Sequence, residues 1–191
     1  MSNKLLKRFP TIACCGLDCG LCPVYYTKGP SRCSGCCGPD FSNKHPSCSI
    51  ITCCVKKKNF ETCGECEDFP CQKIKIWDLA DSFISHKKSL VNLREIKKIG
   101  LEKFMEQQKK RIDFLEFALN DYNEGRSKSF YCIASALLSI SFLESCKKTL
   151  KQKMSNENIR NIKEKSKMLK DILNKGAKEE CVELKLRKKA K

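Results

Sequence analysis

All but three of the sixteen cysteines in this 191-residue chain lie between Cys14 and Cys71. Most follow short, regular spacings: Cys15-x3-Cys19-x2-Cys22, Cys33-x2-Cys36, Cys48-x4-Cys53 and Cys63-x2-Cys66-x4-Cys71. An x2 spacing lets two sulfur atoms on one tight turn reach a single ion, and several such elbows together are typical of metal sites. Cysteines at this density indicate disulfides, zinc or iron–sulfur chemistry, and they constrain the fold more than any other feature.

The redox compartment helps to choose among these three chemistries. Residues 1–10 include basic side chains but no apolar stretch of the length that a secretory signal needs. No apolar run in the sequence approaches the roughly 18 residues of a membrane span. We therefore expect a cytoplasmic protein with no membrane segment. Its thiols would stay reduced, and this favours metal ligation over disulfides.

Apolar and charged residues are unevenly distributed along the chain. Residues 11–71 hold few large aliphatic side chains but many Gly, Pro and Cys, so this segment would need metal in order to fold. The formal net charge is +16, which permits an anionic partner, an unknown protein or nucleic acid. Nucleic acid is the weaker expectation, because aromatic residues are not interleaved with the basic ones. A lysine-rich surface that serves only solubility is the alternative.

The pattern predicts two domains, a cysteine-rich metal-binding domain over residues 11–73 and a basic helical domain over residues 74–191. The expected fold class is α with an irregular, metal-stapled region: a cysteine-rich loop domain packed on a C-terminal bundle of about four helices. Apolar stripes predict helices over residues 90–99, 101–122, 130–143 and 159–173. The first of these stops at Gly100, a residue type favoured just after a helix end.

The last residues show a different periodicity. Val182, Leu184 and Leu186 alternate with charged residues. This alternation predicts a short exposed strand or an extended tail.

The cysteine motifs and the residues between them resemble a known family. The segments that carry the resemblance are CGLDCGLCP at residues 15–23, the Cys33/Cys36 pair, CSIITC at residues 48–53 and CGECEDFPC at residues 63–71. They are similar to a cysteine-rich prokaryotic family of unknown function, Domain of Unknown Function 3795. Residues 86–100, 123–132 and 184–189 also resemble a branch of that family. The resemblance implies a metal-binding, cytosolic protein but no particular activity.

The resemblance also implies a set of ligands. Ten cysteines match the family pattern: Cys15, Cys19, Cys22, Cys33, Cys36, Cys48, Cys53, Cys63, Cys66 and Cys71. Cys14, Cys37 and Cys54 are their neighbours in Cys-Cys doublets, and we interpret these three as bystanders. Two tetrahedral centres would use eight of the ten ligands. The other two would be free, shared or replaced at an open coordination position.

Elbow spacing does not decide which metal binds. Zinc in a recognition or scaffold module is the leading interpretation, and a 4Fe–4S cluster in a redox or electron-transfer protein is the alternative. The spacing from Cys15 to Cys22 is also that of radical S-adenosylmethionine enzymes, but no strand–helix alternation of a large barrel follows. A metal that only staples the fold, and a disulfide framework, are further alternatives. Whether the chain is an enzyme stays open, since the sequence contains no Ser/His/Asp set, dinucleotide fingerprint or paired catalytic acids.

A second candidate site precedes the most apolar helical segment. Arg126, Ser127, Lys128 and Ser129 would place cations at a helix N-terminus, where the helix dipole favours anions. A bound anion would relieve this conflict and use the free backbone N–H groups. The alternative is a solvated turn or a partner for Glu124.

Three other residues are weaker candidates. His45, two residues before Ser47-Cys48, is a candidate metal ligand, whereas His86 on a helical segment is more typical of packing or capping. Cys132 could be a ligand or redox partner, or simply a small buried residue.

Overall fold

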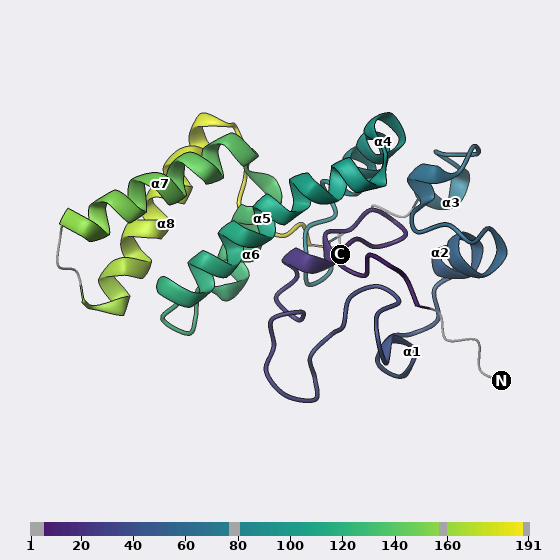
Figure 1. Ribbon diagram of the computed structural model, residues 1–191, viewed down its shortest axis with the longest axis horizontal. Helices are drawn as coiled ribbons and strands as arrows, with labels where there is room; N and C mark the ends of the chain where they lie inside the picture. The colour runs from purple at the N-terminus through teal and green to yellow at the C-terminus, as the bar shows by residue number, and fades with distance from the viewer. Residues whose placement is uncertain (1–5, 77–80, 157–159, 189–191) are drawn as a thin grey trace. The chain divides into compact units, whose positions relative to one another are not determined.

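The computed structural model describes residues 6–76, 81–156 and 160–188 (Figure 1). Within these ranges the secondary structure consists of α-helices and short 3-10 and π turns, without a strand. The chain divides into a first compact unit, residues 1–104 with 186–191, and a second unit, residues 105–185. The predicted fold class is confirmed: a cysteine-rich N-terminal region is followed by a C-terminal helical bundle. The domain limits 11–73 and 74–191 stay a prediction.

Loops and short turns make up most of the first unit. The short elements are α1 (Phe41–Lys44), α2 (Ser49–Ile51), α3 (Gln72–Lys75), the 3-10 turns Cys19–Leu21 and Cys63–Glu65, and the π turn Thr52–Lys57 that continues α2. Both 3-10 turns begin at a cysteine of the family pattern and end just before the next one. The Cys-x2-Cys elbows at Cys19 and Cys63 therefore share one backbone conformation.

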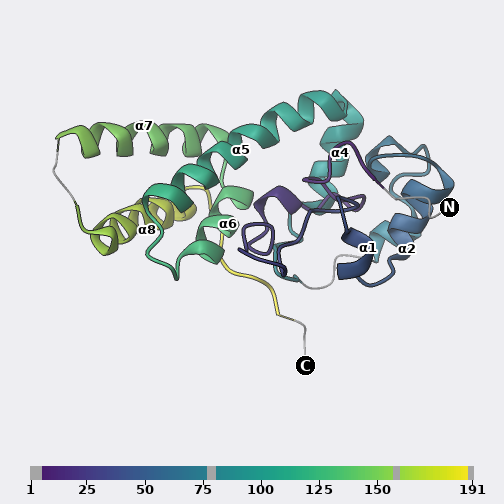
Figure 2. The ribbon, with the colours of Figure 1, turned by 60° about the horizontal axis from the view of Figure 1, so that its bottom comes forward.

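Helix α4 (Ser89–Ile99) packs directly on two cysteine loops, and the α4 ribbon lies beside the N-terminal loops in both views (Figures 1 and 2). Gly16 has φ +83°, and a Cβ atom there would lie 2.3 Å from the carbonyl oxygen of Ser89. A Cβ atom on Gly64 would lie 2.7 Å from the carbonyl oxygen of Leu93. Only glycine permits this close approach of loop and helix backbones.

Polar side chains at the start of α4 complete the contact. Ser89 Oγ donates to the carbonyl oxygen of Cys15 at 2.5 Å. Asn92 Nδ2 donates to the carbonyl oxygen of Gly16 and to Asp18 Oδ1, both at 2.9 Å. Buried loop carbonyls need such partners because the loop lacks the regular backbone hydrogen bonds of a helix or sheet. Helix α4 thus substitutes for regular secondary structure around the Cys15–Cys22 loop.

The C-terminal residues join the first unit through one buried carboxylate. The Asp81 side chain, which has no exposed area, accepts from Arg187 Nη2 at 2.9 Å and from the Arg187 backbone N–H at 2.7 Å. The backbone N–H of His86 donates to the same carboxylate at 2.8 Å. Of the two expectations for the segment near Val182–Leu186, a strand or a tail, the strand is wrong and the structure shows a tail, since residues 182–188 are irregular. The Arg187 backbone N–H donates to the Asp81 side chain, and the Arg187 carbonyl oxygen accepts from the Asp81 backbone N–H at 3.3 Å, without a strand forming.

The described residues of the second unit form four helices, whereas the predicted helix over residues 90–99 is α4 of the first unit. The four helices are α5 (Leu101–Asp121), which starts in the first unit, α6 (Lys128–Leu137), α7 (Ile140–Asn156) and α8 (Ile162–Glu179). Its core is ordinary and apolar, with fully buried side chains at Phe114, Leu115, Tyr122, Tyr131, Leu143, Leu150, Leu169 and Leu173. The exposed Cys181 takes a left-handed conformation (φ 53°) just after α8, and the Val182 N–H bonds back to the Ala177 carbonyl at 2.8 Å. Cys181 therefore serves as a helix C-terminal residue.

The single helix expected over residues 130–143 is wrong. The chain leaves the helix at Leu138 and starts α7 at Ile140. Arg111 donates to the Leu138 carbonyl oxygen at 2.6 Å, and Glu180 accepts from the Ser139 N–H at 2.9 Å. These two distant side chains satisfy the backbone groups that the break exposes, a contribution that local periodicity does not reveal.

The contact between α4 and the Gly16 loop generates a test. Gly16→Ala should lower the free energy of unfolding by about 2–3 kcal/mol, because the new methyl group meets the Ser89 carbonyl. Gly29→Ala is the matched control, since Gly29 also has φ +83° but nothing lies within 4 Å of its Cβ position. Its cost should be about 1 kcal/mol, from the backbone conformation alone. Urea unfolding of the full chain measures both, and equal losses would contradict the proposed dependence on α4.

Candidate metal centre

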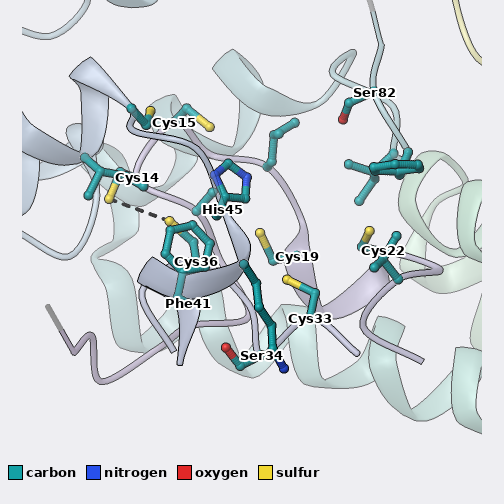
Figure 3. A pocket seen from close by; sticks show the side chains of 18 of the residues that line it. Cys14, Cys15, Cys19, Cys22, Cys33, Ser34, Cys36, Phe41, His45 and Ser82 are labelled. Atoms are coloured by element: carbon teal, nitrogen blue, oxygen red, sulfur yellow. Dashed lines mark hydrogen bonds between the residues drawn. The ribbon is translucent and has the colours of Figure 1, made fainter. Parts of the chain in front are cut away.

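Cysteines line a cavity of about 240 Å³ in the first unit (Figure 3). Six cysteines of the family pattern border it, together with Cys14 and His45: Cys15, Cys19, Cys22, Cys33, Cys36 and Cys48. Apolar side chains such as Val24, Phe41 and Ile50 complete the wall, and Lys44 adds a cation. The cavity therefore offers mostly soft sulfur donors in an apolar setting.

Burial acts on the thiols at this cavity. It raises the pKa of the Cys15 thiol to about 12. It also raises the pKa of Cys19, and the neighbouring Cys36 and Cys15 add to the effect by charge repulsion. A metal ion would reverse these effects because it binds the thiolate form. Without a metal ion, burial favours the neutral thiol form of Cys15 and Cys19.

His45 lies at the wall of the 240 Å³ cavity, as the sequence suggested for a ligand candidate. Its ring stacks on Phe41 with centroids 4.5 Å apart, and its Nδ1 contacts the Pro46 carbonyl oxygen at 3.1 Å. The stacking fixes the ring plane. Its role as a ligand stays a prediction.

The remaining four family-pattern cysteines border a separate, smaller cavity of about 30 Å³. These are Cys53, Cys63, Cys66 and Cys71, and Cys54, Lys58, Phe60 and Phe69 complete the lining. The Lys58 ammonium donates to Cys66 Sγ at 3.2 Å and to Asp68 Oδ2 at 2.6 Å. These hydrogen bonds, first that to Asp68 and then that to Cys66, raise the pKa of Lys58. Lys58 therefore places a positive charge beside a potential thiolate.

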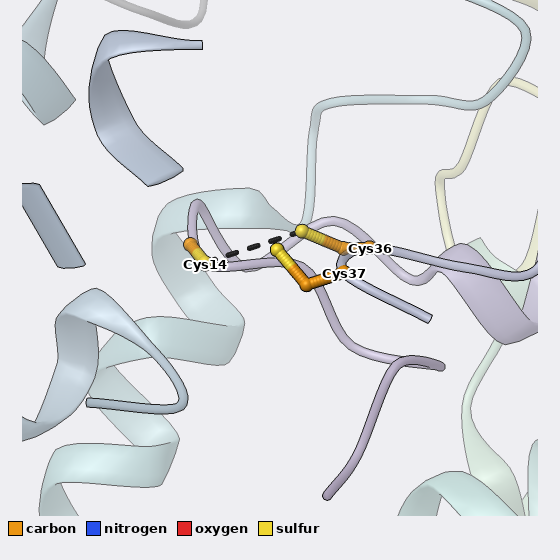
Figure 4. A group of neighbouring side chains, drawn as sticks. All are labelled: Cys14, Cys36 and Cys37. Carbon is orange, nitrogen blue, oxygen red and sulfur yellow. Dashed lines mark hydrogen bonds between the residues drawn. The ribbon is translucent and has the colours of Figure 1, made fainter. Parts of the chain in front are cut away.

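A third grouping of cysteines is buried (Figure 4). The Sγ atoms of Cys14, Cys36 and Cys37 all lie within 4.8 Å of one another, closely enough to hold a metal ion. A hydrogen bond joins the sulfur atoms of Cys14 and Cys36, which are 4.0 Å apart. The contacts with Cys14 and Cys37 hold the pKa of Cys36 well below its usual value. The same hydrogen bond raises the pKa of Cys14.

Lys7 supplies positive charge near this buried cluster. Burial lowers the pKa of its ammonium, but attraction to Cys14, Cys36 and Glu61 outweighs burial, so the pKa is raised. The Lys7 side chain donates to the Ile12 carbonyl oxygen, and its backbone N–H donates to the Cys37 carbonyl oxygen at 3.1 Å. Lys7 is only 7% exposed, and its positive charge can compensate negative charge on the neighbouring thiols. The cysteine spacing did not reveal this lysine.

The structure thus divides the ten predicted ligands into six and four. It also places two of the presumed bystanders, Cys14 and Cys37, within metal-binding distance of Cys36. Sequence reasoning missed the supporting residues Lys7, Lys58 and Asn92. The basic residues carried no signal in a lysine-rich chain, and Asn92 is an ordinary polar residue until α4 is seen to pack on the loop.

The other candidate residues lie elsewhere. Cys132 and Cys146 are buried in the second unit, where burial raises the pKa of Cys146 to about 12. His86 is buried in the first unit, and its Nε2 lies 3.0 Å from Ser82 Oγ. That contact fits the packing role expected for it.

At the predicted anion turn, Ser127 is already hydrogen-bonded to a carboxylate of the chain itself, that of Glu124. Ser127 Oγ donates to Glu124 Oε1 at 2.7 Å, and Ser166 Oγ and Lys170 Nζ donate to the same carboxylate at 2.7 and 3.0 Å. An external anion at Arg126–Ser129 would have to compete with Glu124 or use the cations and backbone only. The anion site stays a prediction, and the partner relation with Glu124 is the alternative that this geometry supports.

Comparison with known proteins agrees with the sequence resemblance. Residues 11–76 match the model of a family described as "Protein of unknown function (DUF3795)". The matched residues, the DUF3795 segment, make up about a third of the chain. The DUF3795 segment contains all ten cysteines of the predicted pattern, and its residues line most of both sulfur-lined cavities. No curated protein and no solved structure matches the chain. None of the described helices is both long and apolar enough to cross a membrane.

The Glu124 network predicts acid sensitivity. Burial raises the pKa of Glu124, but hydrogen bonds from Ser127, Ser166 and Lys170 outweigh it and lower the pKa from 4.5 to about 2. A lowered folded-state pKa contributes stability above about pH 4.5, and this contribution is lost as the pH falls toward 2. Glu124→Gln should cost roughly 2 kcal/mol at neutral pH. The gap to wild type should close between pH 4.5 and 2.

Urea unfolding at several pH values measures that gap. Glu116→Gln, an exposed glutamate on α5, is the control and should change stability little at any pH. A Glu124→Gln deficit that is independent of pH would show that the charge of Glu124 does not carry the effect.

Proposed function

We propose that the DUF3795 segment is a zinc-binding domain in which Cys53, Cys63, Cys66 and Cys71 hold one zinc ion as four thiolates. The observation that carries this proposal is that all four line one small cavity of about 30 Å³, with room for only a few water-sized spheres, whereas the other sulfur-lined cavity measures about 240 Å³. Structural zinc sites are four-coordinate and closed, and thiolate is a preferred ligand. The number and type of donors fit zinc.

Charge supports the same assignment. Four thiolates and one zinc ion leave a local charge of about −2. The Lys58 ammonium, already 3.2 Å from Cys66 Sγ, would offset part of it by hydrogen bonding to a metal-bound sulfur. The Lys97 ammonium adds a second cation nearby, 3.5 Å from the Cys66 carbonyl oxygen.

The 240 Å³ cavity supports a second candidate function. Its six family-pattern cysteines surround far more space than one ion fills, and iron–sulfur clusters are held by cysteine thiolates. A 4Fe–4S cluster here would make the protein a redox or electron-transfer protein. If the 240 Å³ cavity held zinc instead, as the leading proposal favours, the ion would be bound by cysteines together with His45 or another residue.

The biological role that we propose is recognition or scaffolding in the cytoplasm. Metal would hold the loop-rich unit rigid, and the basic helical unit would meet an anionic partner. A groove between α5 and α7 supports this part, since Lys110, Lys147, Lys148 and Lys151 line it. Asp113 and Glu144 lie in the same groove, so the positive charge is mixed rather than a continuous phosphate-binding stripe. This favours a protein partner over nucleic acid.

Metal analysis of cysteine variants tests the zinc proposal. In full chain purified anaerobically, Cys63→Ser should lower bound zinc by about one ion per chain, because it removes one of four thiolate ligands. Cys181→Ser is the control, since Cys181 is exposed and lies just after α8. Equal losses in both variants, or iron instead of zinc at this site, would refute the assignment.

Lys58 provides a finer test of the same centre. Lys58→Met should weaken zinc affinity by about tenfold, because it removes a hydrogen bond to Cys66 Sγ while keeping the length of the side chain. Lys57→Met changes the exposed preceding residue, the last of the π turn, and should leave the affinity unchanged. Competition with a chromophoric zinc chelator measures both variants. A similar affinity for the two would mean that Lys58 does not support the metal.

A further inference from the structure

Three Cys-Cys doublets occur in the DUF3795 segment, at residues 14–15, 36–37 and 53–54. One member of each doublet belongs to the family pattern and borders one of the two sulfur-lined cavities. The other members, Cys14, Cys37 and Cys54, are 1%, 0% and 3% exposed. Their burial could reflect packing alone, since free cysteine behaves as a small apolar residue. The convergence of Cys14 and Cys37 on Cys36 needs a further explanation.

The sulfur atoms of Cys14, Cys36 and Cys37 have the spacing of a three-coordinate metal site. Three sulfur atoms around one ion, with metal–sulfur bonds of about 2.3 Å, lie about 4.0 Å apart. Cys14 and Cys36 match this spacing at 4.0 Å, and the other two pairs lie within 4.8 Å. Figure 4 shows the three side chains directed toward a common point.

The backbone of this region is specialised to bring the sulfur atoms together. Cys37 has φ 57°, a left-handed conformation that is uncommon for a residue with a side chain. Gly35 has φ +83° and allows the close approach of Pro10, whose carbonyl oxygen accepts from the Cys36 N–H at 2.8 Å. Backbone strain of this kind concentrates at functional sites because surrounding contacts must hold it in place.

We propose that Cys14, Cys36 and Cys37 form a three-sulfur metal site, separate from the zinc centre, that takes the soft monovalent ion Cu(I). Thiolate ligands without oxygen or nitrogen donors select soft ions such as Cu(I) over hard cations. Zinc in a structural site takes four protein ligands. Cys54 also contacts Cys14, but it lies outside the group of three sulfur atoms that are all within 4.8 Å of one another, so the arrangement offers three ligands. The neighbouring Lys7 ammonium offsets part of the thiolate charge.

This site goes beyond the zinc proposal. Cys14 and Cys37 lie outside the family pattern, and none of the three cysteines lines the 30 Å³ cavity. Cys54 lines that cavity and contacts both Cys14 and Cys63, so it connects the two groups of cysteines without belonging to the trio. If Cys36 belongs to the three-sulfur site, five cysteines of the pattern and His45 still line the 240 Å³ cavity as potential ligands there.

The test is a titration of the zinc-loaded full chain with Cu(I) under anaerobic, reducing conditions, in competition with a chromophoric Cu(I) chelator. We expect one tightly held Cu(I) per chain, with bound zinc unchanged. X-ray absorption should show three sulfur neighbours around copper. Release of zinc in proportion to added Cu(I), or copper with other than three sulfur neighbours, would overturn the proposal.

Variants locate the site. Cys14→Ser and Cys37→Gly should each abolish the tight Cu(I) equivalent, and Cys37→Gly also suits the left-handed conformation, so its fold is preserved. Cys132→Ser, which changes an equally buried cysteine of the second unit, should keep it. Zinc content, measured in the same samples, separates this proposal from the zinc assignment. Tight Cu(I) binding that survives in the Cys37→Gly protein with its zinc intact would refute the inner site.

Discussion

The close approach of helix α4 to two glycines holds the cysteine-rich unit in its arrangement. Gly16 and Gly64 bring separate cysteine loops within a few ångströms of the α4 backbone, and a side chain at either position would force the loop away. Ser89 and Asn92 then satisfy loop carbonyls that no ladder could reach. A helix without a single cysteine therefore sets the relative position of the elbows, because loops of this length have no regular structure of their own.

The interiors of the two units are filled by different kinds of side chain. The second unit buries large apolar side chains such as Phe114, Tyr131 and Leu150, as an ordinary helical bundle does. The first unit fills much of its interior with thiols, and each sulfur buries little surface while burial opposes its charged form. Bound metal, as proposed, would resolve this conflict, since it neutralises thiolates and cross-links the loops that carry them.

Local patterns predicted the elements whose stability is local. The apolar stripe ending at Gly100 corresponds to α4, and that from Leu101 corresponds to α5. The break between α6 and α7 was missed because its stabilising partners, Arg111 and Glu180, are far away in the sequence. For the segment near Val182 the sequence left a strand and a tail open, and the structure shows the tail, whose Arg187 bonds to Asp81 more than a hundred residues away.

Sequence alone determined which potential ligand groups the cysteine-rich segment offers, namely thiols at regular spacings. The elbow spacings, the ten-cysteine pattern and the match over residues 11–76 all follow from neighbours along the chain, because an x2 turn fixes two sulfurs on one local loop. Only the tertiary structure decided which elbows share a space: six cysteines of the pattern at one cavity, four at another, and Cys14 beside Cys36 and Cys37. That grouping depends on contacts between distant segments, above all those of α4 with Gly16 and Gly64, and spacing along the chain carries no information about them.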